Sequence, residues 1–252
     1  EIAEIISEDM KNNGGLLTYE DLSTYSTKWT DPLFGTYRDL SVYTNHPPGG
    51  GIRLLEMLNI LENFNLAELG HNSTEYIRIV CEAMKQATVD KESFVGDPDF
   101  VNVPIKRLLS KKHAMQCSKH ILSGTKINID RIGQFESKDT THVSVVDKHG
   151  NCVTMTHSLG MPSGAITDGL GFMYNGCMAV FDPRPGRAGS IEPGKSRFSS
   201  LAPTIVTKDS VPYMVLGAPG GTQIAMGILQ TILNVIEFKM NMLEAVSAPR
   251  FS

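Results

Sequence analysis

The chain has 252 residues and a formal net charge of -4 at pH 7, and 41% of its residues are hydrophobic. The length fits one large domain or two small ones, and the apolar fraction is that of a chain that buries a core. The acidic balance and the lack of a Lys/Arg run argue against a nucleic-acid binder. No apolar stretch approaches the roughly 18 residues of a membrane span, so we expect neither nucleic acid nor membrane as a partner.

The four cysteines show no metal-ligand spacing and no C-x-x-C pair. They permit disulfides without indicating them, and they favour a reducing compartment such as the cytoplasm. The chain opens with Glu1 rather than Met, shows no signal peptide and ends abruptly at Ser252, so it reads as a fragment or as part of a processed chain. A periplasmic or secreted location therefore stays open, and no metal or organic cofactor is expected.

Helical patterns dominate the first half of the chain. Residues 1–13 favour a short helix that "NNGG" ends, and Thr18 has the pattern of a helix N-cap. Apolar residues recur at helical spacing after the break "HPPGGG". Further helices are expected over 52–64, 73–94 and 106–122, and a strand is expected over 37–45.

Strand patterns dominate the second half. Residues 142–146 and 152–156 read as strands joined by "DKHGN", and residues 204–207 and 212–216 form a second hairpin pattern across "KDS". A loop rich in Pro, Gly and Arg separates the hairpins, and "GAPGGT" leads from a glycine-rich turn into an apolar helix. Helices followed by strands predict an α+β or layered α/β fold.

The start of the first hairpin carries a candidate nucleophile. A threonine hydroxyl is a weak nucleophile that needs a base within hydrogen-bond reach. If the bond between Asp139 and Thr140 is cut, the new α-amino group of Thr140 titrates near ~8 and can be that base. Asp139 and Thr140 are therefore a candidate cleavage site, and Thr140 is a candidate catalyst. Two threonines before a β-branched run are also the composition of an ordinary strand.

Two residue pairs complete the candidate site. The glycine pair, Gly220 and Gly221, precedes the apolar helix, where backbone amides can face the negative charge of an oxyanion. The serine pair, Ser199 and Ser200, precedes a strand and can hydrogen bond a substrate carboxylate or a tetrahedral oxygen. Each pair also has a structural interpretation, as a tight turn or a turn cap. The G-x-G-x-x-G and phosphate-loop patterns are absent, so a nucleotide site is not indicated.

The chain resembles the γ-glutamyltransferase family of autoprocessing N-terminal-nucleophile hydrolases. The resemblance lies in "TTHVSVVDKHGN", "PGKSRFSSLAPTIV", "GAPGGT" and "SAPRFS", and in the first half in "GGLLTYEDLSTY", "YRDLSVYTNHPPGGG" and "GDPDFVNVP". It covers essentially the whole chain, and the family is longer at both ends. It implies a four-layer αββα sandwich in which residues 1–139 are the C-terminal part of a large subunit and residues 140–252 the N-terminal part of a small catalytic subunit. The two parts together are expected to form one structural domain.

The resemblance also implies residue roles. Thr140 corresponds to the nucleophile of both self-cleavage and acyl transfer, and Ser158 to a threonine whose hydroxyl supports that nucleophile. The glycine pair corresponds to the oxyanion hole, and the serine pair to residues that hold the α-carboxylate of the substrate. The implied partners are a small-molecule amide, either a γ-glutamyl compound or a carboxylate-bearing amide, and the chain's own large and small subunits.

The chain departs from the family where the substrate is expected. Gly160 stands at a usual Asn, and Ala179 and Val180 replace an acidic pair, one member of which normally pairs with the α-ammonium of a γ-glutamyl group. A buried ammonium without a partner costs on the order of several kcal/mol, and valine cannot balance it. The reach of Asp182, two residues further on, is left open. The loop that follows is short and carries cations that can bind carboxylates: Arg184, Arg187, Lys195 and Arg197.

These departures favour the amidohydrolase-like branch of the family, which includes oxamate amidohydrolases and cephalosporin-acylase-like proteins. We expect a threonine hydrolase that passes an acyl group from Thr140 to water or an amine, from a donor with a carboxylate but no required α-ammonium. Two alternatives stay open: a true glutathione hydrolase or γ-glutamyltransferase, and a non-catalytic homologue. His142 is expected to have a structural role beside the nucleophile, because the α-amine supplies the base.

Overall fold

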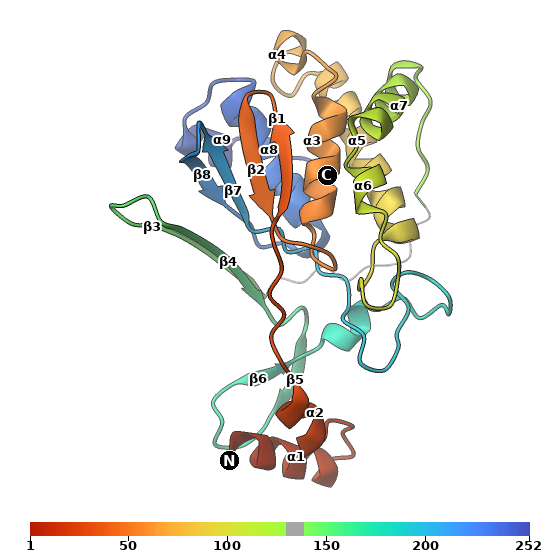
Figure 1. Cartoon of the computed structure of the whole chain (residues 1–252), viewed down its shortest axis with the longest axis vertical. Helices are drawn as coiled ribbons and strands as arrows, with labels where there is room; N and C mark the ends of the chain where they lie inside the picture. The colour runs from red at the N-terminus through yellow and green to blue at the C-terminus, as the bar shows by residue number, and fades with distance from the viewer. Residues whose placement is uncertain (130–138) are drawn as a thin grey trace.

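A four-stranded antiparallel sheet with the order β1-β2-β7-β8 forms the centre of the molecule (Figure 1). The computed structural model describes residues 1–129 and 139–252. The strands are β1 (Leu33–Tyr37), β2 (Leu40–Thr44), β7 (Thr204–Lys208) and β8 (Val211–Leu216). Because β2 pairs with β7, strands from before and after residue 140 share one sheet.

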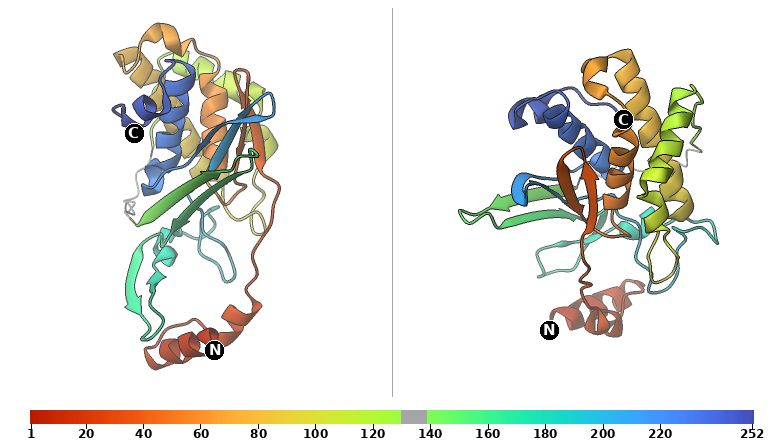
Figure 2. Two further views of the ribbon diagram at one scale, coloured as in Figure 1. Left: turned by 90° about the vertical axis from the view of Figure 1, so that its left-hand side faces the viewer. Right: turned by 45° about the horizontal axis from the view of Figure 1, so that its top comes forward.

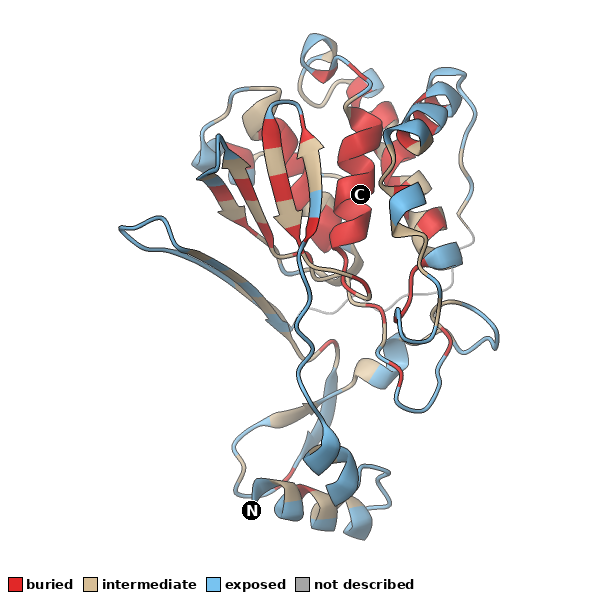
Figure 3. Ribbon diagram, viewed as in Figure 1, coloured by how far each residue is buried: buried red, intermediate tan, exposed pale blue. Residues whose placement is uncertain are grey.

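Helices cover one face of this sheet (Figures 1 and 2). The central helix α3 (Gly51–Leu61) packs on β1 and β2 and also contacts α8 (Ile224–Ile236), while α5 (Thr74–Phe94) and α7 (Lys111–Leu122) lie against its outer side. Every residue of α3 is buried, and Figure 3 shows the buried core concentrated in this helix and its neighbours. Helices packed on an antiparallel sheet confirm the expected α+β class.

A long hairpin extends from this body and packs against β8 (Figure 1). It consists of β3 (Thr140–Val146) and β4 (Cys152–Ser158), which pair antiparallel along their whole length. The described residues thus contribute a helix layer, one sheet and a two-stranded hairpin to the sandwich. One face of the hairpin is mostly polar, and the other carries four exposed apolar side chains: Val143, Val145, Val153 and Met155.

A smaller group of elements lies beside the body. Helices α1 (Ile2–Asn12) and α2 (Tyr19–Thr24) adjoin the hairpin of β5 (Pro162–Ile166) and β6 (Met173–Asn175) (Figure 1). The hydroxyl of Thr167, just after β5, hydrogen bonds the carboxylate of Asp9 and so ties α1 to this hairpin.

Local start signals mark several of the described helices, and one predicted boundary needs correction. Helix α2 begins with a complete capping box at Thr18, as predicted. The single helix expected over 106–122 is wrong, because the chain forms α6 (Ile105–Leu108) and then α7. The Ser110 hydroxyl accepts a hydrogen bond from the His113 amide at 3.1 Å, so a second N-cap interrupts the helical pattern.

Several short elements were not predicted. They are β1, the β5–β6 hairpin, α4 (Leu66–Leu69) and α9 (Met242–Ser247). In β1 the alternation is broken by Gly35, where a Cβ would lie 2.9 Å from Cδ2 of Leu55, so the glycine lets α3 approach the strand. All four cysteines are free thiols. In the part of the chain that the structure describes, no helix combines the length and apolarity needed to cross a membrane.

Candidate active site

The first residue of β3 and the last residue of β4 face each other. Thr140 pairs with Ser158, and their hydroxyl oxygens lie 2.8 Å apart. The Ser158 hydroxyl is also 3.4 Å from the carbonyl oxygen of Asp139, the residue before Thr140. The amide of Gly160 donates to the same hydroxyl at 2.9 Å. One hydroxyl therefore contacts both the expected nucleophile and the carbonyl of the expected cleavage site.

The hydrogen-bonding capacity of Ser158 matches this arrangement. A serine hydroxyl has one proton and two lone pairs. The lone pairs can accept from the Gly160 amide and the Thr140 hydroxyl, which leaves the Ser158 proton for the Asp139 oxygen. Negative charge develops on that oxygen when a nucleophile adds to the carbonyl, and a donor placed there stabilises it. The geometry thus suits attack by Thr140 on the preceding peptide bond.

A polar stripe continues from this pair along the hairpin. It consists of Thr140, His142 and Ser144 on β3 and of Thr154, Thr156 and Ser158 on β4. Nδ1 of His142 lies 2.8 Å from the Thr156 hydroxyl, and Nε2 lies 3.0 Å from the Ser144 hydroxyl. Burial lowers the pKa of His142, so the ring is neutral at pH 7. Its contacts fit the expected role in positioning rather than in base catalysis.

The end of β8 packs on this histidine. A Cβ at Gly217 would lie 2.2 Å from Cε1 of His142, so only glycine lets the backbone pass so close to the ring. The segment then reaches Gly220, with φ 126°, and Gly221, with φ 54°, both in the region that favours glycine. Gly221 opens the short 3-10 helix η2 (Gly221–Gln223), which leads into α8.

The glycine pair is thus on the chain segment beside β3. Among the residues that the structure describes, no hydrogen bond joins Gly220 or Gly221 to Thr140. Their assignment to an oxyanion hole therefore remains a prediction.

The serine pair lies on the turn that begins α3. The amide of Ser199 donates to the Pro48 carbonyl at 2.8 Å, and the amide of Gly50 donates to the Leu201 carbonyl at 2.9 Å. A Cβ at Gly50 would lie 2.4 Å from the carbonyl oxygen of Ser200. The "HPPGGG" turn therefore packs against the serine pair and fixes its backbone. A substrate role for these hydroxyls remains a prediction.

Asn45 holds the same turn against the segment of the serine pair, and this role was not predicted from the sequence. Its Nδ2 donates to the Leu201 carbonyl at 2.8 Å, and its Oδ1 accepts from the Gly51 amide at 3.0 Å. One side chain therefore joins the start of α3 to the segment after the serine pair. The available signal was a polar residue at the end of an alternating strand, directly before a glycine-rich turn.

Two cations of the loop are already paired. Arg184 donates from Nε and Nη2 to the carboxylate of Asp182 at 3.0 and 2.8 Å. Lys195 forms an ion pair with Glu192 at 2.9 Å. Since Arg184 occupies the carboxylate of Asp182, this acid is not free to replace the acidic pair that the chain lacks.

Gly160 follows the hairpin and lies close to Arg197 and to the short helix η1 (Cys177–Val180). Its φ is 68°, and a Cβ built on it would lie 2.4 Å from Sγ of Cys177 and 3.4 Å from Nη2 of Arg197. The glycine therefore leaves room for the Cys177 thiol, and the Arg197 guanidinium lies beside the residue whose amide binds the Ser158 hydroxyl.

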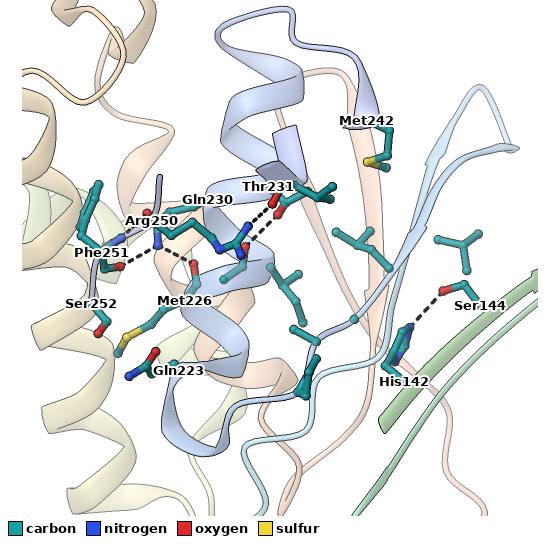
Figure 4. A pocket seen from close by; sticks show the side chains of 18 residues that line it. His142, Ser144, Gln223, Met226, Gln230, Thr231, Met242, Arg250, Phe251 and Ser252 are labelled. Carbon is teal, nitrogen blue, oxygen red and sulfur yellow. Dashed lines mark hydrogen bonds between the residues drawn. The ribbon is translucent and has the colours of Figure 1, made fainter. Parts of the chain in front are cut away.

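His142 also lines a cavity of about 580 Å³ (Figure 4). His142 and Ser144 line one wall, and Met226, Gln230 and Arg250 line the other. Thr140 and Ser158 do not line it, so this cavity is not the pocket of the nucleophile.

Three titratable groups, of which two are buried, form a separate cluster between α3, α5 and α7. Nε2 of His113 lies 3.0 Å from Glu56 and 3.3 Å from Asp90. Hydrogen bonds to Asp90, Cys117 and Glu56 raise the pKa of His113, and burial raises the pKa of Glu56. The ligand atoms of the three residues lie within 4.8 Å of one another, as in a metal site. A cationic His113, an anionic Asp90 and a protonated Glu56 balance their charges, so mutual hydrogen bonding accounts for the cluster.

The sheet, its helix layer and a hairpin that opens with a hydroxyl pair are the architecture of an N-terminal-nucleophile hydrolase. The chain belongs to the gamma-glutamyltranspeptidase family, whose model matches residues 1–252. The recognition made from the sequence motifs is thereby confirmed.

Relatives named glutathione hydrolase and relatives named acylase have the same sequence identity to this chain. The chain is 38% identical over 268 residues to the glutathione hydrolase proenzyme of Escherichia coli (strain K12), covering 99% of this chain and 46% of that protein. It is 38% identical over 253 residues to the acylase ACY 1 proenzyme of Pseudomonas sp. (strain SE83), covering 99% and 45%. The crystal structure of cephalosporin acylase from Bacillus halodurans matches with a TM-score of 0.85 and 29% identity, over 99% of this chain and 45% of that one. The chain thus spans a little under half the length of these relatives.

Proposed function

We propose that this chain forms the nucleophile-bearing part of an autoprocessing threonine amidohydrolase. The observation that carries the proposal is the Ser158 hydroxyl, which lies 2.8 Å from Oγ1 of Thr140 and 3.4 Å from the carbonyl oxygen of Asp139. One hydroxyl can therefore hydrogen bond both the attacking oxygen and the oxygen of the carbonyl that is attacked. Relatives that are named proenzymes, a glutathione hydrolase and an acylase, support the same activity.

In the proposed maturation, Oγ1 of Thr140 attacks the carbonyl carbon of Asp139. A C–O bond forms, and the carbonyl electron pair moves to the oxygen beside Ser158. The C–N bond then breaks, the nitrogen of Thr140 takes up the proton that the Thr140 hydroxyl has lost, and an ester links Asp139 to Thr140. Water hydrolyses that ester, which leaves a carboxylate on Asp139 and a free α-amine on Thr140. The two parts, 1–139 and 140–252, would then belong to the large and small subunits of one domain.

In the proposed turnover, the new amine is the base. It titrates near ~8, so part of it is neutral at physiological pH and can take the proton of the Thr140 hydroxyl. The hydroxyl oxygen attacks the substrate amide, the leaving amine takes a proton, and an acyl-enzyme remains. Water or a second amine then removes the acyl group. The glycine pair would stabilise the tetrahedral oxygen, and the serine pair would hold a substrate carboxylate.

The proposed acyl donor carries a carboxylate and does not require an α-ammonium. Ala179 and Val180 offer no charge to an ammonium, and the nearby carboxylate of Asp182 is bound by Arg184. The second candidate, a glutathione hydrolase, has in its favour the 38% identity to the enzyme of Escherichia coli. Because the identity to an acylase is also 38%, sequence identity favours neither candidate.

The proposal is tested by intact-mass analysis of the full-length protein. The wild type is compared with Thr140→Ala and with the matched control Thr141→Ala, which changes the neighbouring threonine opposite His157. We expect the wild type and the control to split between Asp139 and Thr140, and Thr140→Ala to stay whole. A wild type that stays whole after folding would refute autoprocessing.

A further inference from the structure

The guanidinium of Arg197 lies next to Gly160, whose amide binds the Ser158 hydroxyl. Its Nη2 is 3.4 Å from the point where a Cβ of Gly160 would be. The amide of Gly160 donates to the Ser158 hydroxyl at 2.9 Å, and that hydroxyl is 2.8 Å from Oγ1 of Thr140. A guanidinium therefore lies next to the residue whose amide binds the partner of the expected nucleophile.

Unlike Arg184 and Lys195 of the same loop, Arg197 has no carboxylate partner among the described residues, and unlike Arg187 it is not exposed. Arg184 is paired with Asp182, and Lys195 is paired with Glu192. Arg197 is half-buried and donates from Nη1 to the carbonyl of Phe198 at 2.9 Å. A guanidinium has five N–H donors in a planar fork, so most of its donors remain available to a ligand.

Two features of the chain affect the space and the charge beside Arg197. Gly160 lacks the Cβ that would collide with Sγ of Cys177. Helix η1, which begins at Cys177, carries Ala179 and Val180 in place of two acids. Near Gly160 the structure therefore brings a cation, Arg197, beside the start of a helix without acids at the two positions where the family resemblance implies them.

We propose that Arg197 binds the carboxylate of the acyl donor, so that the donor site selects an anionic group where relatives with the acidic pair would hold an ammonium. Arg197 stands two residues before Ser199, so its fork and the serine hydroxyls can meet on one carboxylate. This inference rests on the proposed function, because it takes Thr140 as the residue that receives the acyl group.

Matched p-nitroanilides test the inference on the full-length, processed protein. The glutaryl donor ends in a carboxylate, its monoamide ends in a neutral carboxamide, and the γ-glutamyl donor has both a carboxylate and an ammonium. The variants are Arg197→Gln and Arg197→Lys. The control is Arg184→Gln, which removes the same charge from the same loop where the guanidinium is already bound to Asp182.

We expect the wild type to favour the glutaryl donor over the monoamide in kcat/KM. Arg197→Gln should lower kcat/KM for the glutaryl donor by roughly tenfold to a hundredfold and leave that for the monoamide within about threefold. Arg197→Lys should recover part of the loss, since it keeps the charge without the fork. Arg184→Gln should behave as the wild type on the glutaryl donor and its monoamide, and every variant should still process itself.

The outcomes separate this inference from the proposed function. A processed wild type without preference for the glutaryl donor, or an Arg197→Gln variant that loses both activities equally, would overturn the role of Arg197 and leave autoprocessing intact. A wild type that never splits at Thr140 would refute the proposed function and this inference together.

Discussion

The hydroxyl oxygens of Thr140 and Ser158 lie 2.8 Å apart because the register of β3 and β4 pairs the first residue of one strand with the last residue of the other. The pair stands at the open end of the hairpin, where Asp139 enters β3 and Gly160 follows β4. A strand register, which depends on the turn far from the site, therefore sets the geometry of the expected nucleophile.

Ser158→Ala is expected to slow self-cleavage. The substitution removes the donor beside the Asp139 oxygen and the acceptor of the Gly160 amide, which is worth about 1.5–3 kcal/mol, or roughly tenfold to a hundredfold in rate. The measurement is the appearance of the two fragments on a denaturing gel over time. Ser158→Thr is the control and should process at close to the wild-type rate, since it keeps the hydroxyl. Equal rates for Ser158→Ala and the wild type would exclude a role for this hydroxyl in cleavage.

Gly50→Ala is expected to destabilise the protein and to reduce turnover together. The added Cβ would lie 2.4 Å from the carbonyl oxygen of Ser200, so the backbone of the serine pair must move. Overpacking of this kind costs about 1–3 kcal/mol of unfolding free energy, which denaturant titration measures.

The control for this change is Gly227→Ala in α8. A Cβ there meets no atom within 4 Å, and the helical backbone gains stability from alanine, about 0.5–1 kcal/mol. If both variants unfold at the same denaturant concentration, the contact between Gly50 and the serine pair does not constrain the fold.

The His113 cluster predicts that stability falls as pH rises. The pKa of His113 is raised to about 11 in the folded state from an ordinary value of 6.5, first through its hydrogen bond to Asp90. The folded chain therefore keeps a proton that the unfolded chain loses above about pH 6.5. The contribution is fully present below that pH and is lost as pH approaches the folded pKa. The raised pKa of Glu56 acts in the same direction from its ordinary value upward.

Unfolding free energy measured between pH 6 and pH 10 checks this dependence. We expect a decline of up to about 1.4 kcal/mol per pH unit for one proton, with a smaller slope in His113→Gln. The variant should also be about 3 kcal/mol less stable at pH 7, because it leaves the anion of Asp90 buried without its cation. Identical slopes for the two proteins would remove His113 as the source.

The sequence was sufficient for the parts of the site that depend on local pattern. The "DKHGN" turn and the alternation around it predict the β3–β4 hairpin, and continuing its register by two residues brings Thr140 opposite Ser158. The capping box at Thr18 likewise marks the start of α2. These features are determined by neighbours in the chain, and so periodicity and turn chemistry indicate them.

The remaining contacts join residues that no local pattern connects. Asn45 binds the carbonyl of Leu201 from 156 residues away, and His113 binds Glu56 across 57 residues. The approach of Arg197 to Gly160 depends likewise on how a loop folds over the end of the hairpin. Such contacts follow from tertiary packing, which is why the sequence suggested a carboxylate-binding loop without choosing among its cations.

The pairing of β3 with β4 along its whole length also determines what a cut before Thr140 would change. The strand would stay bonded to its partner, and the hydroxyl of Thr140 would keep its position while the molecule gained one ammonium and one carboxylate. Maturation of this kind needs no rearrangement of the hairpin. The difference between precursor and mature site would then be one of ionisation and open space, with the same oxygen atom serving first an internal peptide and afterwards an external amide.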